Sequence, residues 1–357
     1  MLTLPTEYAM MEEDSLIEKI LKIKKQMGSE LTILAHHYQN PEIVKLADFA
    51  GDSFELAKRG SQLKETKIIV FCGVYFMAEA ARTLAGEKQT VYIPNREAGC
   101  PLADFAPIKD VVCAWKELEQ ITDTKKIIPI CYMNSSADIK AFCGEHGGLV
   151  CTSSNAQKVF QWAFEQGEKI FFFPDENLGR NTADKMKLKD LIVWNPAQIL
   201  GGNSAEQITK APVILWKGYC HVHAHWFKTA DIDKMRAEHS GVKIIVHPEC
   251  TPDVVKSADD NGSTAYIIQY VEKAAPECII AIGTELNLVK RLHDRYKGQK
   301  TVIPLKRSVC PNMMKISIPH LLFCLENLDK PDFVVNVEQR VIDNGRLALE
   351  RMLQVNG

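Results

Sequence analysis

The hydrophobic pattern of the chain changes period several times along its 357 residues. Over residues 12–27 apolar side chains recur at helical spacing and Gly28 follows, so we expect an amphipathic helix there. Beyond it, β-rich apolar runs alternate with helical stretches, and these runs lie at 31–36, 67–72, 89–94, 126–131, 169–173, 212–216, 242–247, 278–283 and 300–304. Such alternation is typical of βαβ units, so the pattern predicts an α/β protein with mostly parallel sheets.

The nine predicted strands fall into three sets that repeat the same features in the same order. The first strand of each set runs into a polar cluster, in LTILAHHYQN, KIIPICYMNS and VKIIVHPECT. A hydroxyl-bearing turn follows, in AGDSFELA, CTSSNAQK and NGSTAYII. The third strand ends in a turn with a cysteine, in VYIPNREAGCP, VILWKGYCHVH and VIPLKRSVCPN. Between these turns and the third strands, the second strand of each set enters a helix, in KIIVFCGVYFMAEA, KIFFFPDENLGRNTA and CIIAIGTELNLVKR. Four features in one order, three times, indicate an internal repeat.

The spacing within the sets separates three cysteines from the other eight. The polar cluster and the cysteine are 63 residues apart in the first and third sets and 88 apart in the second, counted from His37 to Cys100, His247 to Cys310 and Tyr132 to Cys220. The surplus of the middle set lies at about 186–211, a polar stretch that we interpret as an insertion.

We therefore expect three copies of one α/β unit, whose strand ends would face one cavity if the units pack around a pseudo-threefold axis. The predicted boundaries are 1–28 for an N-terminal helix, 29–108, 109–226 and 227–320 for the three repeats, and 321–357 for a C-terminal helical segment that packs back on the core. The stretch from Val337 to Leu353 is predicted to be an amphipathic helix.

Ligands of open parallel sheets bind outside the carboxyl ends of the strands, where each repeat places its polar residues. We therefore expect Cys100, Cys220 and Cys310 to meet near the axis. Three thiolates suit a zinc ion with a further ligand or a water, or a [4Fe–4S] cluster with one open iron. The other cysteines lie mostly in apolar patterns and are predicted to be small buried hydrophobic residues: Cys72, Cys113, Cys131, Cys143, Cys151, Cys250, Cys278 and Cys324.

Groups that can donate hydrogen bonds and carry protons follow the first strand of each repeat. They are His36, His37 and Tyr38 in the first copy, Tyr132 and Asn134 in the second, and His247 and Glu249 in the third. Ser53, Ser153 and Thr264 begin helices, where a hydroxyl either caps the helix or, with the free N–H groups beside it, holds an anion. The alternating His221, His223 and His225 indicate a strand-like segment in which His223 faces the site.

Composition limits the classes of function. The formal net charge is −2 with dispersed basic residues, which is not the pattern of a nucleic-acid-binding protein. The longest apolar runs are shorter than a membrane span, and the N-terminus is too acidic for a signal peptide. We therefore expect a cytoplasmic protein, in which the eleven cysteines are ligands, nucleophiles or core residues rather than disulfides.

Several of these motifs are specific enough to indicate a family. LAHHYQ (34–39), GDS (51–53), GVYFMAE (73–79), NREAGCP (95–101), YMNSS (132–136), CTSSNA (151–156), PDENLG (174–179), HPEC (247–250), GST (262–264), GTE (283–285) and VCPNM (309–313) resemble those of the quinolinate synthases. The resemblance runs from about residue 30 to residue 320. One departure is His221, where some relatives carry proline after the cysteine.

The resemblance implies an iron–sulfur enzyme of NAD biosynthesis with three αβα domains and a [4Fe–4S] cluster on Cys100, Cys220 and Cys310. It implies condensation of iminoaspartate with dihydroxyacetone phosphate to quinolinate, phosphate and water, and coupling to an L-aspartate oxidase. The substrate-binding residues that it implies are His36, Ser53, Tyr132, Asn134, Ser153, His247, Glu249 and Thr264. Tyr38 and Glu249 are implied as proton-transfer groups, Tyr132 as an orienting group and His223 as an assistant.

Three other functions share part of this chemistry. An aconitase-like [4Fe–4S] hydro-lyase would use an open iron on one hydroxy acid. A non-enzymatic redox protein would ligate its cluster fully and would have no use for the polar clusters. A zinc hydrolase would bind a different metal. The family motifs argue against the hydro-lyase. Four tight protein ligands would support the redox protein, and the brown colour of anaerobically purified protein would separate the enzyme from a zinc hydrolase.

Overall fold

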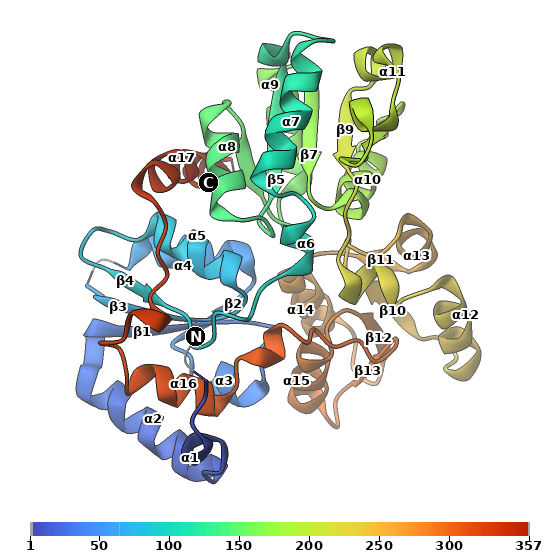
Figure 1. Ribbon diagram of the computed structural model, residues 1–357. Coiled ribbons are helices and arrows are strands. Elements are labelled where there is room, and N and C mark those ends of the chain that lie inside the picture. The colour runs from blue at the N-terminus through green and yellow to red at the C-terminus, as the bar shows by residue number, and fades with distance from the viewer. Residues whose placement is uncertain (1–2, 64, 356–357) are drawn as a thin grey trace. The chain divides into compact units, whose positions relative to one another are not determined.

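A computed structural model describes residues 3–63 and 65–355 of the chain (Figure 1). The chain divides into two compact units, one from the described parts of 1–100 and 309–338, the other from those of 101–308 and 339–357. Three sheets are present, with four, five and four strands, and every strand pair within them is parallel. Helices surround the sheets, so the predicted α/β class is confirmed.

The first unit is built on the sheet β2-β1-β3-β4. Its strands are β1 (Leu31–His36), β2 (Phe49–Gly51), β3 (Ile68–Cys72) and β4 (Thr90–Tyr92). Its helices are α1 (Thr6–Ala9), α2 (Glu13–Met27), α3 (Pro41–Leu46), α4 (Ser53–Gln62), α5 (Tyr75–Leu84) and α16 (Ile318–Leu325). Figure 1 shows α4 and α5 on one face of this sheet and α2 and α16 on the other, which explains why β1 is buried along its whole length.

The second unit contains the other two sheets, in the orders β6-β5-β7-β9-β8 and β11-β10-β12-β13. The strands of its first sheet are β5 (Ile127–Tyr132), β6 (Leu149–Cys151), β7 (Lys169–Phe173), β8 (Ile192–Trp194) and β9 (Val213–Trp216). The helices of this part are α6 (Pro101–Asp104), α7 (Ile108–Glu119), α8 (Ala137–Glu145), α9 (Ala156–Gln166), α10 (Glu176–Lys185), α11 (Ala205–Lys210) and α17 (Gln339–Gln354). The C-terminal helix α17 packs against α8, and Gly144 permits the close approach because a Cβ there would lie 1.8 Å from the carbonyl oxygen of Asn344.

The last sheet has the strands β10 (Lys243–Val246), β11 (Asp260–Asn261), β12 (Ile279–Gly283) and β13 (Thr301–Pro304). Figure 1 shows α14 (Thr264–Lys273) and α15 (Leu286–Tyr296) on one of its faces and α12 (Thr229–Glu238) and α13 (Pro252–Ser257) on the other. Phe227, Ile232 and Val254 pack with Ile244 and Ala281 in a fully buried cluster between that second pair of helices and the sheet.

The three sheets share a core order: the first strand of each set lies between the short second strand and the third, and the last strand (β4, β9 or β13) follows the third. In the second sheet β8 is added at the edge beyond β9. Backbone contacts repeat too. In the first copy Ile33 donates to Asp48 and Asp48 returns a bond to Ile33, and in the third copy Ile244 and Asp259 do the same. The repeat inferred from the sequence is therefore also a repeat of topology.

All nine predicted strands are present, but the structure adds four short ones. β2, β6 and β11 are two or three residues long, too short to give a periodic apolar signal, and they form because the neighbouring central strand supplies hydrogen-bond partners. The fourth, β8, lies inside the stretch 186–211 and pairs with β9 at the sheet edge. That stretch is therefore a structured extension of the second sheet and not only a polar insertion.

Within residues 3–63 and 65–355, no helix is both long enough and apolar enough to cross a membrane.

Candidate active site

Turns at the carboxyl ends of the central strands place the predicted polar residues. After β1, the N–H of Tyr38 donates to Nδ1 of His36 at 3.2 Å, and after β10 the N–H of Glu249 donates to Nδ1 of His247 at 3.3 Å. The same i, i+2 contact thus fixes a histidine ring in the first and third copies. After β5, the hydroxyl of Ser135 instead donates to the carbonyl of Tyr132 at 2.8 Å.

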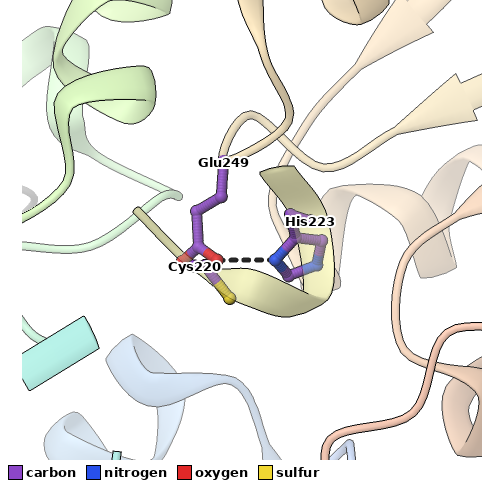
Figure 2. Close-up of side chains that lie close together, drawn as sticks. All are labelled: Cys220, His223 and Glu249. Carbon is purple, nitrogen blue, oxygen red and sulfur yellow. Dashed lines mark hydrogen bonds and ion pairs between the residues drawn. The ribbon is translucent and has the colours of Figure 1, made fainter. Parts of the chain in front are cut away.

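Glu249 is the centre of a buried hydrogen-bond network in the second unit. Its carboxylate accepts a short hydrogen bond from the hydroxyl of Tyr132, and its Oε2 lies 2.6 Å from Nδ1 of His223. The other ring nitrogen of His223 lies 3.0 Å from Oγ1 of Thr284. Glu249 is only 3% exposed and His223 2%, so the carboxylate and imidazole interact out of bulk water. Figure 2 shows the two side chains pointing toward one another.

His247 extends this network on its other side. Its ring stacks on that of His223 with centroids 4.3 Å apart, and its Nε2 lies 3.2 Å from the hydroxyl of Ser153. Two sheets therefore contribute to one site. The first supplies β5, the β6–α9 turn and the segment after β9, and the other supplies the turn after β10. It contains Tyr132, Ser153, His223, His247 and Glu249 from the predicted site residues, and Thr284, which the sequence analysis did not single out although it lies in the GTE motif.

Burial and neighbouring charge set the protonation of the network. Burial, and to a smaller extent nearby His223, lower the pKa of His247 to about 3, while Glu249 opposes the shift. Burial alone would raise the pKa of Glu249, but His223, His247 and the hydrogen bond from Tyr132 outweigh it and hold that pKa below its ordinary value. The site thus combines the ionised carboxylate of Glu249 with the neutral imidazole of His247.

The lowered pKa of His247 makes stability depend on pH. As the pH falls below about 6.5 the unfolded chain protonates this histidine while the folded chain does so only near pH 3, so unfolding becomes more favourable in that window. Between about pH 7 and about pH 5 we expect a loss of about 2 kcal/mol from this group. Urea unfolding at the two pH values checks it: His247→Asn is expected to reduce the difference by that amount, and an unchanged difference would contradict the assignment.

Cys220 lies beside this network. Its Sγ, a ring nitrogen of His223 and a carboxylate oxygen of Glu249 all lie within 4.8 Å of one another (Figure 2). The segment His221–His225 forms a π-helical turn, so the predicted strand-like segment is wrong. The turn nevertheless buries His223 toward Glu249, while His221 is half-buried and His225 is exposed.

The short distance between His223 and Glu249 bears on which metal could bind. Two ligands of one tetrahedral zinc ion, each about 2.0–2.1 Å from the metal, lie about 3.3 Å apart. Nδ1 of His223 and Oε2 of Glu249 are 2.6 Å apart and hydrogen-bonded to one another. This geometry suits an acid–base pair next to a thiolate better than a mononuclear Cys-His-Glu zinc site.

The three predicted cysteine ligands share a local structure. Cys100, Cys220 and Cys310 are each half-buried. Two residues before each cysteine, a backbone carbonyl accepts a hydrogen bond from the first N–H of a helix, and that helix is α5, α10 or α15. The N–H of Tyr75 donates to Ala98 at 2.7 Å, that of Glu176 to Gly218 at 2.9 Å, and that of Leu286 to Ser308 at 2.8 Å. The same contact in three copies supports their equivalence, and that they meet at one point stays a prediction.

The side chain of Asp175, in the PDENLG motif, contributes a further contact to the turn of Cys220. It is fully buried and caps α10, accepting from the N–H of Leu178 at 2.8 Å, and the backbone N–H of Cys220 approaches its carboxylate closely enough to lower its pKa. Burial and the charge of Glu249 raise its pKa, although the backbone hydrogen bonds act in the opposite direction. The sequence analysis quoted the motif but gave this residue no role.

The remaining predicted residues lie elsewhere. In the first unit His36 and Tyr38 are buried and their rings meet edge to face at 4.7 Å. Asn134 lies in the turn after β5 and is half-buried. That His36, Tyr38, Ser53, Asn134 and Thr264 share one cavity with Glu249 stays a prediction.

The hydroxyls predicted as possible helix caps do not have that function. Asp52 caps α4 in a capping box, Ser263 caps α14, and Asn155 occupies the cap position of α9. Ser53 and Thr264 are therefore the first residues within their helices, and Ser153 precedes the cap position by two residues. The reading of these hydroxyls as caps is wrong.

Two of the other eight cysteines depart from the prediction that they are buried. Cys113 is exposed on α7, and Cys278 is half-buried in the loop directly before β12. The other six are buried.

The site defines a class of protein: an α/β enzyme whose buried carboxylate, phenol and imidazole lie at the carboxyl ends of parallel strands beside a cysteine. The model of a family described as quinolinate synthetase A protein matches residues 18–354. The quinolinate synthase of Bacillus subtilis is 45% identical over 99% of this chain and 96% of its own length. The corresponding values are 44%, 99% and 90% for that of Corynebacterium glutamicum, and 43%, 98% and 93% for that of Rhodopirellula baltica. The chain belongs to the quinolinate synthase family, a family of enzymes of NAD biosynthesis.

Proposed function

We propose that this enzyme condenses iminoaspartate with dihydroxyacetone phosphate to give quinolinate, phosphate and water. The observation that carries the proposal is the buried contact of Glu249 with Tyr132 and His223, next to Cys220. Loss of water and phosphate from such substrates requires placed acids and bases. The family membership of the chain supports the same activity.

Glu249 is proposed as the base that removes a proton next to a carbonyl or imine carbon. A carboxylate that accepts two hydrogen bonds is a weak base, so we expect the substrate to displace the hydroxyl of Tyr132 before the proton moves. His223 keeps Glu249 oriented: because the carboxylate is ionised, Nδ1 donates to it, and Nε2 lies within hydrogen-bond distance of Thr284 on the other side of the ring. Tyr132 and Asn134 would orient the substrate, and Tyr38 would carry protons in the later steps.

The substrates bring two carboxylates and one phosphate, and the chain offers donors for them. Ser53 and Thr264 stand at the first position of α4 and α14, directly after the cap residues Asp52 and Ser263, where their hydroxyls can donate to an anionic group. Ser153 and His247, already joined at 3.2 Å, would hold another anionic group, and His36 a further one.

Cys100, Cys220 and Cys310 are proposed to hold a [4Fe–4S] cluster. The three half-buried turns with the same backbone contact fit three equivalent thiolate ligands. When bound, such a cluster would supply a Lewis-acidic iron that polarises a hydroxyl or carboxylate oxygen of the substrate. Functional coupling to an L-aspartate oxidase, which would supply iminoaspartate, is part of the same proposal.

Asp175 is expected to stabilise the turn of Cys220. Asp175→Ala removes a helix cap and the acceptor for the N–H of Cys220, so we expect about 1 kcal/mol less stability and several-fold faster loss of iron to a chelator. Asp175→Asn keeps an acceptor oxygen and is expected to retain most of the wild-type iron lifetime. Ser263→Ala, which removes the cap of α14, is the matched control that should lower stability only. Equal iron loss in the Asp175→Ala and Ser263→Ala variants would contradict the role.

An anaerobic assay tests the proposed function. Protein purified without oxygen is supplied with iminoaspartate and dihydroxyacetone phosphate, quinolinate is measured, and iron and sulfide are counted. Quinolinate formation with about four irons per chain supports the proposal. No quinolinate, with dehydration of a single hydroxy acid instead, would favour the aconitase-like hydro-lyase.

A further inference from the structure

A polar cavity of about 550 Å³ lies in the second unit, outside the Glu249 network. Its walls are the start of α9, the side of α10, the backbone at Pro248 and the loop that leads into α14. Its volume is sufficient for a small metabolite. Among the predicted substrate-binding residues, only Ser153 lines it.

The start of α9 opens into this cavity without a side-chain cap. Asn155 occupies the cap position, but its Oδ1 turns back to accept from the N–H of Thr152 at 2.7 Å and from the hydroxyl of Thr152 at 3.2 Å. The first-turn N–H groups of this eleven-residue helix, at residues 156–158, thus receive no cap from Asn155. The helices on either side differ, since Asp175 caps α10 and Ser263 caps α14.

The second observation is a buried amide that lacks a partner. Asn155 is 3% exposed and lines the cavity, and its Nδ2 has no acceptor among the residues that the structure describes. A buried donor left unsatisfied costs about 1–3 kcal/mol, so such groups normally mark the position of a water or a ligand. Because Oδ1 of Asn155 is fixed by Thr152, it is the donor end of the amide that lacks a partner.

Charges around the cavity favour an anion. Lys158 and Lys185 both line it, and Nζ of Lys185 lies 3.5 Å from the carbonyl of Asn261. The carboxylate that lines the cavity, Asp260, accepts a hydrogen bond from the hydroxyl of Tyr266 at 2.8 Å. The cavity is therefore lined by two cations and the positive end of a helix, against a single carboxylate that already accepts a hydrogen bond.

We propose that this cavity is a second anion-binding site, which takes inorganic phosphate or a small phosphate monoester outside the acid–base network. Several donors that converge from a helix start, an amide and two lysines match the three or four oxygen atoms of phosphate better than the two of a carboxylate. The assignment of the site to the phosphate-bearing substrate as it enters, or to phosphate as it leaves, rests on the proposed function. Binding of phosphate itself does not.

Inorganic phosphate is the probe, titrated calorimetrically into anaerobically purified holoenzyme. Asn155→Asp is the sharpest variant, because it keeps the oxygen that Thr152 needs and replaces the unpartnered donor with a negative oxygen. A carboxylate at a helix N-terminus favours the helix, which offsets part of the cost of the buried negative oxygen, and the thermal unfolding of the variant is measured alongside. We expect phosphate affinity to fall at least tenfold (~1.4 kcal/mol) in this variant and in Lys158→Ala/Lys185→Ala.

Lys189→Ala is the matched control, since Lys189 is exposed near the end of α10 and does not line the cavity. Glu249→Gln should keep the tenfold sensitivity to Asn155→Asp, because Glu249 does not line the cavity. Absence of phosphate binding in the wild type, or equal affinity in Asn155→Asp, would overturn the proposal. Asn155-dependent binding in an enzyme that forms no quinolinate would sustain this site and refute the proposed function instead.

Discussion

Replacing Glu249 with glutamine is expected to lower quinolinate formation by about 10²–10⁴-fold, the usual contribution of a general base. Glutamine has the size of glutamate and can still hydrogen-bond to Tyr132 and His223, so the network should keep its shape. It cannot take a proton from carbon. The measurement is the anaerobic rate of quinolinate formation, together with iron content, which we expect to be unchanged.

Glu238→Gln is the matched control, because Glu238 is exposed on α12 and contacts only Lys234 at 3.8 Å among the ion pairs of the described residues. Full activity in that variant shows that a glutamate-to-glutamine change is harmless by itself. Normal turnover in Glu249→Gln would remove Glu249 from the mechanism and leave the carboxylate a purely structural role.

Serine at any one of Cys100, Cys220 or Cys310 is expected to abolish the visible absorbance of the iron–sulfur cluster almost completely. A serine hydroxyl stays protonated at neutral pH, whereas a cluster needs a thiolate at each of its three protein ligands. The anaerobic visible spectrum and an iron and sulfide count are the measurements. Quinolinate formation should be lost in parallel.

Cys113→Ser is the control, since this thiol is exposed on α7 away from the strand ends and should leave the spectrum intact. The informative variant is Cys220→Ser, because Cys220 lies outside the 63-residue spacing that connects the other two. A Cys220→Ser protein with a full cluster and full activity would refute the shared cluster.

Much of the architecture could be predicted because the apolar pattern that indicates a strand or helix is contained in the residues of that element alone. Central strands such as β5 and β7 are buried throughout and therefore read as continuous apolar runs. β2, β6 and β11 could not be found in this way, since two or three residues become a strand only when a neighbour provides hydrogen bonds. The extension with β8 was missed for the same reason.

For the site, the order of features in the repeat identified Cys220, and the turns at the strand ends identified Tyr132, His247 and Glu249. The role of Asp175 required the fold, because its carboxylate meets the N–H of Cys220 only after α10 and the turn after β9 have packed together. The pairing of His223 with Thr284 likewise joins residues that are 61 positions apart.

The sequence alone was sufficient to predict the α/β class, the threefold repeat and the cysteine in the turn at the end of each repeat, because each depends on residue types that follow one another in a fixed order. Only the tertiary structure decided how the side chains pair. It placed Glu249 between Tyr132 and His223, gave the cap positions to neighbours of the predicted hydroxyls, and left a buried amide of Asn155 facing a polar cavity. Those outcomes depend on contacts between distant segments and on burial, which set both hydrogen-bond partners and pKa and have no periodic trace in the chain.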